Sequence, residues 1–129
     1  MAANNSLPPD VEAFLREHIT SVEELEVLLL LHASADKSWS AAEASQQLYR
    51  QVDSVSARLE NFRAAGLINS DGQNPPRYRY DPTSRHHSMV LNLEQAYKER
   101  KDTVIRLIFE TPRDHLRIFS DAFKIRRSD

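Results

Sequence analysis

Two helix signals and a hairpin signal follow one another in residues 40–80, which read SAAEASQQLYRQVDSVSARLENFRAAGLINSDGQNPPRYRY. Ser40 and Glu43 have the spacing of a capping box, in which the serine hydroxyl accepts from the third amide of the helix and the glutamate reaches back to the serine amide. This pair predicts a helix that begins at residue 41 and runs to about residue 50.

A second helix is predicted over residues 54–65, after a tight connection over residues 50–53 in which we expect Val52 to pack inward. Three apolar side chains recur along it at helical spacing and predict its buried side, namely Val55, Leu59 and Phe62. Gly66 follows where a left-handed residue commonly ends a helix, because glycine has no Cβ to clash there. Two helices joined by so short a turn form a helix-turn-helix.

Two short β-prone segments flank a loop of turn residues directly after these helices. Leu67-Ile68 precedes the loop 69–76 and Tyr78-Arg79-Tyr80 follows it, and the Asp-Gly and Pro-Pro pairs in the loop are typical of a hairpin. Side chains alternate across a strand, so we expect Arg77 and Arg79 on one face and the tyrosines on the other.

The N-terminal third of the chain is predicted to be mainly helical. Apolar residues at helical spacing predict a helix over residues 10–19. Ser21 and Glu24 repeat the capping-box spacing and open a leucine-rich helix that runs to about residue 35. Because this helix is apolar almost all round, we expect it at the centre of the domain, followed by a short edge strand at Ser38-Trp39.

Helical patterns also fill the C-terminal third. A long helix is predicted over residues 86–110, with its apolar stripe interrupted at Arg100-Lys101, and a last helix follows Thr111-Pro112 to about residue 125. The last helix carries two apolar stripes, and we expect one of them to be buried in a second copy of the chain; the alternative is that both pack on their own domain. The stripes are Leu116, Phe119 and Phe123, and Ile118, Ala122 and Ile125.

The order of these elements predicts a mainly α fold, a winged helix-turn-helix with a small β-hairpin wing and extra N- and C-terminal helices. The segment 53–68 resembles the recognition helix of winged-helix bacterial transcriptional regulators of the MarR and ArsR kind, and the terminal helices resemble the MarR type. The resemblance implies a homodimer that binds double-stranded DNA. We expect a disordered tail over 1–9 and a single domain over 10–129, with a winged-helix core at 21–81 and dimerising helices at 86–126.

Seven side chains are candidates for DNA contact. The resemblance implies that the small polar residues at the start of the helix 54–65 face DNA, and helical projection turns the side opposite Val55 outward. Asp53, Ala57 and Glu60 share that outward side, where the acids would face a polyanion. In winged-helix geometry, arginines of the wing reach the minor groove or the flanking phosphates. The candidates are Ser54, Ser56, Arg58, Asn61, Arg77, Arg79 and Arg85.

The composition narrows the possible functions. The 129-residue chain has a formal net charge of -2, with ten acidic against four basic residues in 1–60 and nine against thirteen in 61–129, so a nucleic acid would meet the second half. It lacks a phosphate-binding glycine loop and a nucleophile motif, and we therefore expect no enzyme activity and no cofactor. With no cysteine, and with His86-His87 adjacent rather than on one helix face, no metal site is predicted.

The sequence also predicts a protein without membrane attachment. The longest apolar run covers residues 27–31, far short of the roughly 20 residues that a spanning helix needs. The first six residues have neither the basic nor the apolar region of a signal peptide, so we expect a cytoplasmic location.

A winged-helix adaptor that binds another protein, without strong DNA binding, is the alternative function. The acidic first half of the chain and the thin basic character of the helix 54–65 favour it. In that case the helix 54–65 or the Phe119/Phe123 stripe docks the partner. Solvent-side positions for Arg77 and Arg79 on an edge strand are compatible with DNA contact and with its absence.

Overall fold

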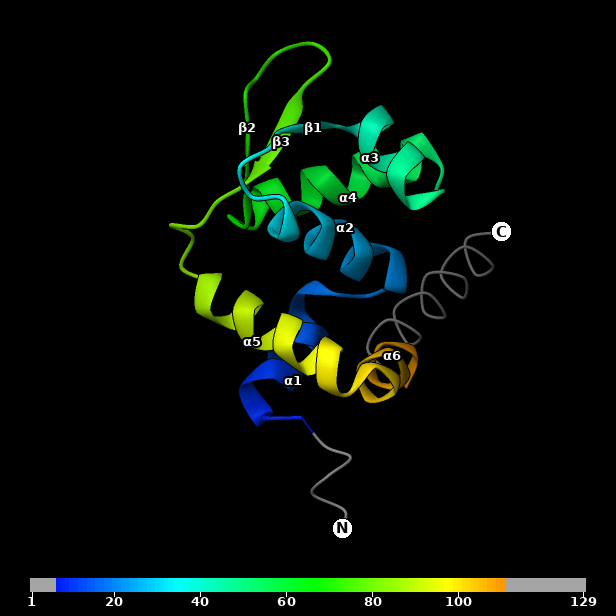
Figure 1. Cartoon of the computed structure of the whole chain (residues 1–129), viewed down its shortest axis with the longest axis vertical. Coiled ribbons are helices and arrows are strands. Elements are labelled where there is room, and N and C mark those ends of the chain that lie inside the picture. The colour runs from blue at the N-terminus through cyan, green and yellow to red at the C-terminus, as the bar shows by residue number, and fades with distance from the viewer. Residues whose placement is uncertain (1–6, 111–129) are drawn as a thin grey trace, which may run out of the picture.

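The computed structural model describes residues 7–110, which form two layers (Figure 1). One layer contains α1, α5 and α6, and the other contains α2, α3, α4 and a small sheet of β1, β2 and β3. The elements are α1 (Pro9–His18), α2 (Val22–Ala33), β1 (Trp39–Ser40), α3 (Ala41–Leu48), α4 (Val52–Ala64), β2 (Ile68–Ser70), β3 (Arg77–Tyr80), α5 (His87–Glu99) and α6 (Lys101–Glu110). None of the helices within residues 7–110 is long and apolar enough to cross a membrane.

The chain is folded from residue 7 onward, which shortens the tail predicted over residues 1–9. Helix α1 begins at Pro9, whose fixed φ suits the first helical position. Leu7, just before it, is buried in the same core as Val11. Burial of Leu7 therefore ties this end of the chain to the domain, and residues 1–6 of the predicted tail lie outside the described residues.

Helix α2 lies at the centre of the molecule, as its leucine content predicts. Its fully buried side chains are Leu25, Val27, Leu28 and Leu31. The Ser21 hydroxyl accepts from the Glu24 amide at 3.1 Å, as expected. The Glu24 carboxylate, however, reaches past Ser21 and accepts from the amide and the hydroxyl of Thr20, at 2.6 and 2.7 Å. This cap therefore ties the loop between α1 and α2 to the first turn of α2.

The helix-turn-helix is formed by α3 and α4. The capping box predicted for α3 is complete, because the Ser40 hydroxyl accepts from the Glu43 amide and the Glu43 carboxylate accepts from the Ser40 amide, at 3.1 and 3.2 Å. The turn begins at Tyr49, a left-handed residue with φ 58°. Helix α4 follows, and its buried side is as predicted: Val55, Leu59 and Phe62 are at most 2% exposed.

The prediction that Val52 packs inward is wrong, since this side chain is 44% exposed. Helix α4 begins at Val52 itself, two residues earlier than the sequence pattern indicated. Val52 does lie on the same side of the helix as Leu59. Lying on the buried side of a helix does not by itself bury its first residue, because no helical turn precedes that residue to help cover the side chain.

Gly66 ends α4 as predicted. It adopts φ +82°, and its amide donates to the Arg63 carbonyl at 3.1 Å. The next amide, that of Leu67, donates to the Phe62 carbonyl at 3.0 Å. These two bonds are the Schellman motif, which satisfies carbonyls that the helix end would otherwise leave free and turns the chain into β2.

The predicted hairpin is present as β2 and β3, and β1 adds a third antiparallel strand in the order β1-β3-β2. Trp39 of β1 lies opposite Tyr78, and Ile68 of β2 lies opposite Tyr80. Tyr78 and Tyr80 are both 1% exposed, so they form the core side of the sheet. The Trp39 indole is also buried, and its Nε1 donates to the Ser34 hydroxyl at 3.0 Å.

The single long helix predicted over residues 86–110 is wrong, because the structure contains two helices here. Helix α5 ends at Glu99, because the φ of -138° and ψ of 54° of Arg100 are not helical, and α6 begins at Lys101. The break turns α6 so that it packs on both α1 and α5, which buries Val104 and Ile108 in the common core. The predicted last helix after Thr111-Pro112 lies outside the described residues.

Leu59→Ala is expected to lower the free energy of unfolding by about 2–5 kcal/mol, because truncating a buried leucine leaves a cavity. Val52→Ala is the control on the same helix, and it should change that free energy by less than about 0.5 kcal/mol, because the side chain is largely in water. Urea unfolding followed by circular dichroism measures both variants. Equal losses in the two would contradict the assigned buried side of α4.

Candidate nucleic-acid interface

Helix α4 presents one whole side to solvent. Its exposed residues include Asp53, Ala57 and Glu60, which helical projection turned outward, and also Asn61 and Ala64. The opposite side packs into the core that α2 shares. The helix is therefore held by one side and open on the other, next to the β2–β3 hairpin (Figure 1).

Two of the predicted contact residues on α4 are turned toward α2 instead of outward. The Ser54 hydroxyl donates to the Glu23 carboxylate. Arg58, one turn further, lies 3.5 Å from both Glu23 Oε2 and Glu24 Oε2, and its Nε is buried without a hydrogen-bond partner. The acidic first turn of α2 thus holds both side chains, and sequence spacing could not reveal this because the partners are 31 to 35 positions away.

The other two predicted residues on α4 are accessible to different degrees. Asn61 is exposed, and Ser56 is half-buried. Glu60, beside Asn61, accepts from the Tyr78 hydroxyl at 2.6 Å and pairs with Arg63 at 3.0 Å. Hydrogen bonds from Arg63 and Tyr78 hold the pKa of Glu60 below its ordinary value.

The Tyr78 hydroxyl stays protonated as a donor to Glu60. Burial, followed by the hydrogen bond to this carboxylate, raises the pKa of Tyr78 to about 12. The bond joins the exposed side of α4 to the central strand of the sheet, so it fixes the hairpin relative to the helix.

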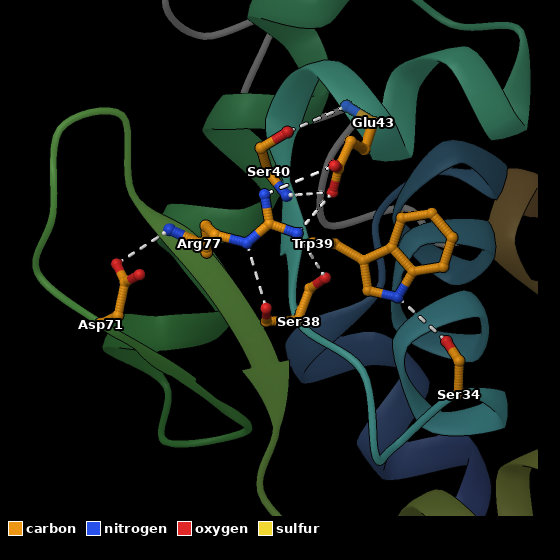
Figure 2. Close-up of polar contacts among 7 residues, drawn as sticks. All are labelled: Ser34, Ser38, Trp39, Ser40, Glu43, Asp71 and Arg77. Carbon is orange, nitrogen blue, oxygen red and sulfur yellow. Dashed lines mark hydrogen bonds and ion pairs between the residues drawn. The ribbon is translucent and has the colours of Figure 1, made fainter.

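Arg77 attaches the hairpin to the start of α3 (Figure 2). Its guanidinium donates from Nε to the Ser38 hydroxyl at 3.1 Å and from Nη2 to the Ser38 carbonyl at 3.0 Å. The same group forms an ion pair with Glu43 at 2.8 Å. These bonds hold the Arg77 side chain beside β1, at the end of β3 that adjoins the tip loop.

The loop at the tip of the hairpin, residues 71–76, contains one acidic and no basic residue. The Asp71 carboxylate accepts from the amides of Gln73 and Arg77 at 2.9 and 3.0 Å. The backbone bonds from Arg77 and Gln73 lower the pKa of Asp71. The positive charge of the hairpin is therefore carried by strand β3 and not by the loop at its tip.

Arg79 and Arg85 are both exposed and are held by neutral groups. Arg79 donates to the carbonyls of Ala35 and Asp36 at 3.3 and 2.7 Å. Arg85 approaches His86, with Nε 3.3 Å from its Nε2. Neutral acceptors leave the positive charge of an arginine uncompensated, so both remain able to attract an anion.

Lys37 is a basic residue near Arg79 that the sequence analysis did not select. Its Nζ lies 3.9 Å from the centre of the Trp39 ring, a cation–π contact that places the charge beside β1. In the sequence, the only indication of this contact was the aromatic residue Trp39, two positions after Lys37.

The structure brings together histidines that are scattered in the sequence. His32 Nδ1 lies 3.0 Å from Glu94 Oε2, and His87 Nδ1 lies 2.7 Å from the Tyr80 hydroxyl, with the two imidazole centres 6.1 Å apart. His18 and His86 form a second pair, with ring centres 5.0 Å apart. Within residues 7–110, no group of three or more side chains has the arrangement of a metal site.

The fold is a winged helix-turn-helix, with six described helices and a three-stranded antiparallel sheet. It is similar to the solved structure of MepR, a transcription regulator of the Staphylococcus aureus multidrug efflux pump MepA. The match has a TM-score of 0.55 and 18% sequence identity, and covers 92% of this chain and 86% of that one. No protein-family model and no curated protein matches the sequence. The winged-helix fold predicted from residues 40–80 is confirmed.

Arg58→Ala is expected to lower the free energy of unfolding by roughly 1–3 kcal/mol, because it leaves the buried Glu24 carboxylate without its cation. Arg63→Ala, on the same helix, should leave that free energy nearly unchanged, because its ion pair with Glu60 is exposed to water. Thermal unfolding compares the two variants. A larger loss in Arg63→Ala than in Arg58→Ala would contradict a structural role for Arg58.

Arg77→Gln is expected to raise the pKa of Glu43 toward its ordinary value of 4.5, because the bond from Arg77 is the largest cause that lowers it. Folding lowers the pKa of this carboxyl, so its ionised form stabilises the folded protein at any pH above the pKa of the unfolded state. That stabilisation is lost as the pH falls through the lower pKa of the folded state. Stability should therefore rise less between about pH 3 and pH 6 in Arg77→Gln than in the parent.

Carboxyl NMR titration measures the pKa of Glu43 directly. Arg63→Gln is the control, since it removes the cation of Glu60 and should leave Glu43 unaffected. An unchanged Glu43 titration in Arg77→Gln would overturn the proposed cause.

Proposed function

We propose that this protein is a DNA-binding transcription regulator that acts through its winged helix-turn-helix. One observation carries the proposal: α4 is seated on the core by Val55, Leu59 and Phe62, while its other side is exposed beside the hairpin. A recognition helix needs this arrangement, because it must enter the major groove without unfolding the domain. The similarity to a solved transcription regulator supports the proposal at the level of the fold.

The charges at the base of the hairpin support the same partner. Arg79 and Arg85 are exposed and bonded to neutral acceptors, and the exposed Lys37 directly follows Asp36, whose carbonyl accepts from Arg79. Such cations contact phosphates, which position a protein on the duplex without reading its sequence.

A homodimer is part of the proposal. Two copies of α4 would enter successive major grooves about 34 Å apart, on a pseudo-palindromic site. The support comes from the sequence alone: the apolar spacing of residues 116–125 predicts a helix with two apolar stripes, one of which a second copy would cover. The protein would then be located in the cytoplasm, where it meets DNA.

A protein-binding adaptor is the second candidate. Asp53 and Glu60 lie on the exposed side of α4, and Arg58 and Arg77 are already paired with carboxylates. These pairs reduce the charge available to a polyanion, and phosphate attraction supplies most of the affinity for DNA of any sequence.

Binding to a fluorescent duplex of random sequence, titrated with salt, tests the proposal. The parent should bind at 50 mM salt and weaken steeply toward 200 mM. The double variant Arg79→Ala, Arg85→Ala should reduce the salt dependence by about two units of slope, because each lost phosphate contact removes about one. Arg16→Ala, Arg106→Ala is the control, since it removes the same charge from α1 and α6.

No binding at low salt would contradict the DNA-binding proposal. If the protein is instead an adaptor, a pull-down after nuclease treatment should retain one partner protein in a stoichiometric amount. Sedimentation measured on the same sample tests the homodimer, and a monomer at micromolar concentration would contradict it.

A further inference from the structure

We infer that α4 reads A·T base pairs, with Asn61 on adenine and the Ala57 methyl group on thymine, and that its surface rejects guanine. This inference rests on the proposed DNA-binding function and adds the chemistry of the bases that α4 selects. It depends on which α4 side chains the structure leaves exposed and which it engages elsewhere.

Three exposed residues form one row along α4. Asp53, Ala57 and Asn61 follow each other at intervals of four, so they are neighbours on the same side of the helix. Four residues advance a helix by about 6 Å, close to two base-pair steps of about 3.4 Å. Ala57 and Asn61 can therefore contact nearby base pairs in one groove.

No described arginine on α4 is directed at the groove. Arg58 is turned to Glu23 and Glu24 of α2, and Arg63 is bound to Glu60. Guanine is most often read by arginine or lysine, whose two donors meet its O6 and N7 acceptors. The exposed side of α4 therefore lacks a pair of donors for guanine, because both arginines of the helix are paired with carboxylates.

One acid on this side, Asp53, acts against guanine directly. Both carboxylate oxygens of Glu60 already accept hydrogen bonds, from Arg63 and from Tyr78, whereas Asp53 is an exposed carboxylate at the second position of the helix. A carboxylate is only an acceptor, so it cannot pair with the two acceptors of guanine. It matches the bases that present an amino group in the major groove, which are adenine and cytosine, so Asp53 disfavours guanine only on the strand that it faces. The choice of A·T over the reversed C·G pair therefore rests on Asn61 and Ala57.

Asn61 and Ala57 supply the favourable contacts with an A·T pair. An asparagine amide has one donor and one acceptor, which match adenine N7 and N6 in the major groove. The thymine methyl is apolar and packs against a small apolar side chain such as that of Ala57. Ala57 is exposed, and its short side chain allows the close approach that a methyl contact needs.

The experiment selects bound sequences from a randomised duplex pool at 50 mM salt, and then measures the affinity for the selected duplex and its variants. The selected half-site should contain A·T pairs at neighbouring positions. Replacing one A·T pair by G·C should weaken binding about fivefold to a hundredfold. Replacing the contacted thymine by uracil, which removes only the methyl group, should weaken it about threefold to fourfold.

Variants of α4 assign these effects to residues. Asn61→Ala should lose the preference for A·T over G·C at one position, and Ala57→Gly should lose the difference between thymine and uracil. Ala13→Gly, at an exposed position of α1, is the control for glycine in a helix and should keep both preferences. Circular dichroism of each variant verifies that α4 is still folded.

The outcomes separate this inference from the proposed function. Duplex binding without any preference for A·T, or a preference that Asn61→Ala leaves unchanged, overturns the inference alone. Absence of duplex binding in the parent protein overturns the DNA-binding function and the inference with it.

Discussion

The contact between α2 and α4 is the constraint on which the rest of the structure depends. Leu25, Leu28 and Leu31 on α2 share one buried cluster with Val55 and Leu59 on α4. Burial of each such side chain contributes roughly 1.5–3 kcal/mol to stability. Only one side of α4 carries the apolar residues that can be buried in this way. The other side is exposed as a direct result, and the hairpin that follows Gly66 is placed beside it.

The same packing determines which charges are available at the interface. Seating α4 on α2 brings Arg58 to the acidic first turn of α2, and closing the sheet brings Arg77 to Glu43. These arginines stabilise contacts within the protein, whereas Arg79 and Arg85 keep neutral partners. The candidate interface therefore has its positive charge near the base of the hairpin, while acceptors and small groups occupy the exposed side of α4.

Much of the fold could be predicted because its signals are local. The Ser40/Glu43 capping box, the spacing of the buried residues on α4 and the left-handed Gly66 each involve only a few neighbouring residues. The candidate site was less predictable. Of the four α4 residues selected, Ser54 and Arg58 bond to Glu23, which is more than 30 positions away in sequence, so no local pattern could show that they are engaged.

The sequence by itself determined the type and order of the elements and the side of α4 that is buried, since these follow from periodicity and capping along a continuous stretch of chain. Only the tertiary structure decided the break at Arg100, the exposure of Val52 and the partners of each arginine. Each of these depends on which neighbour covers a residue or meets its charge. That neighbour is supplied by packing between distant segments, which local sequence does not encode.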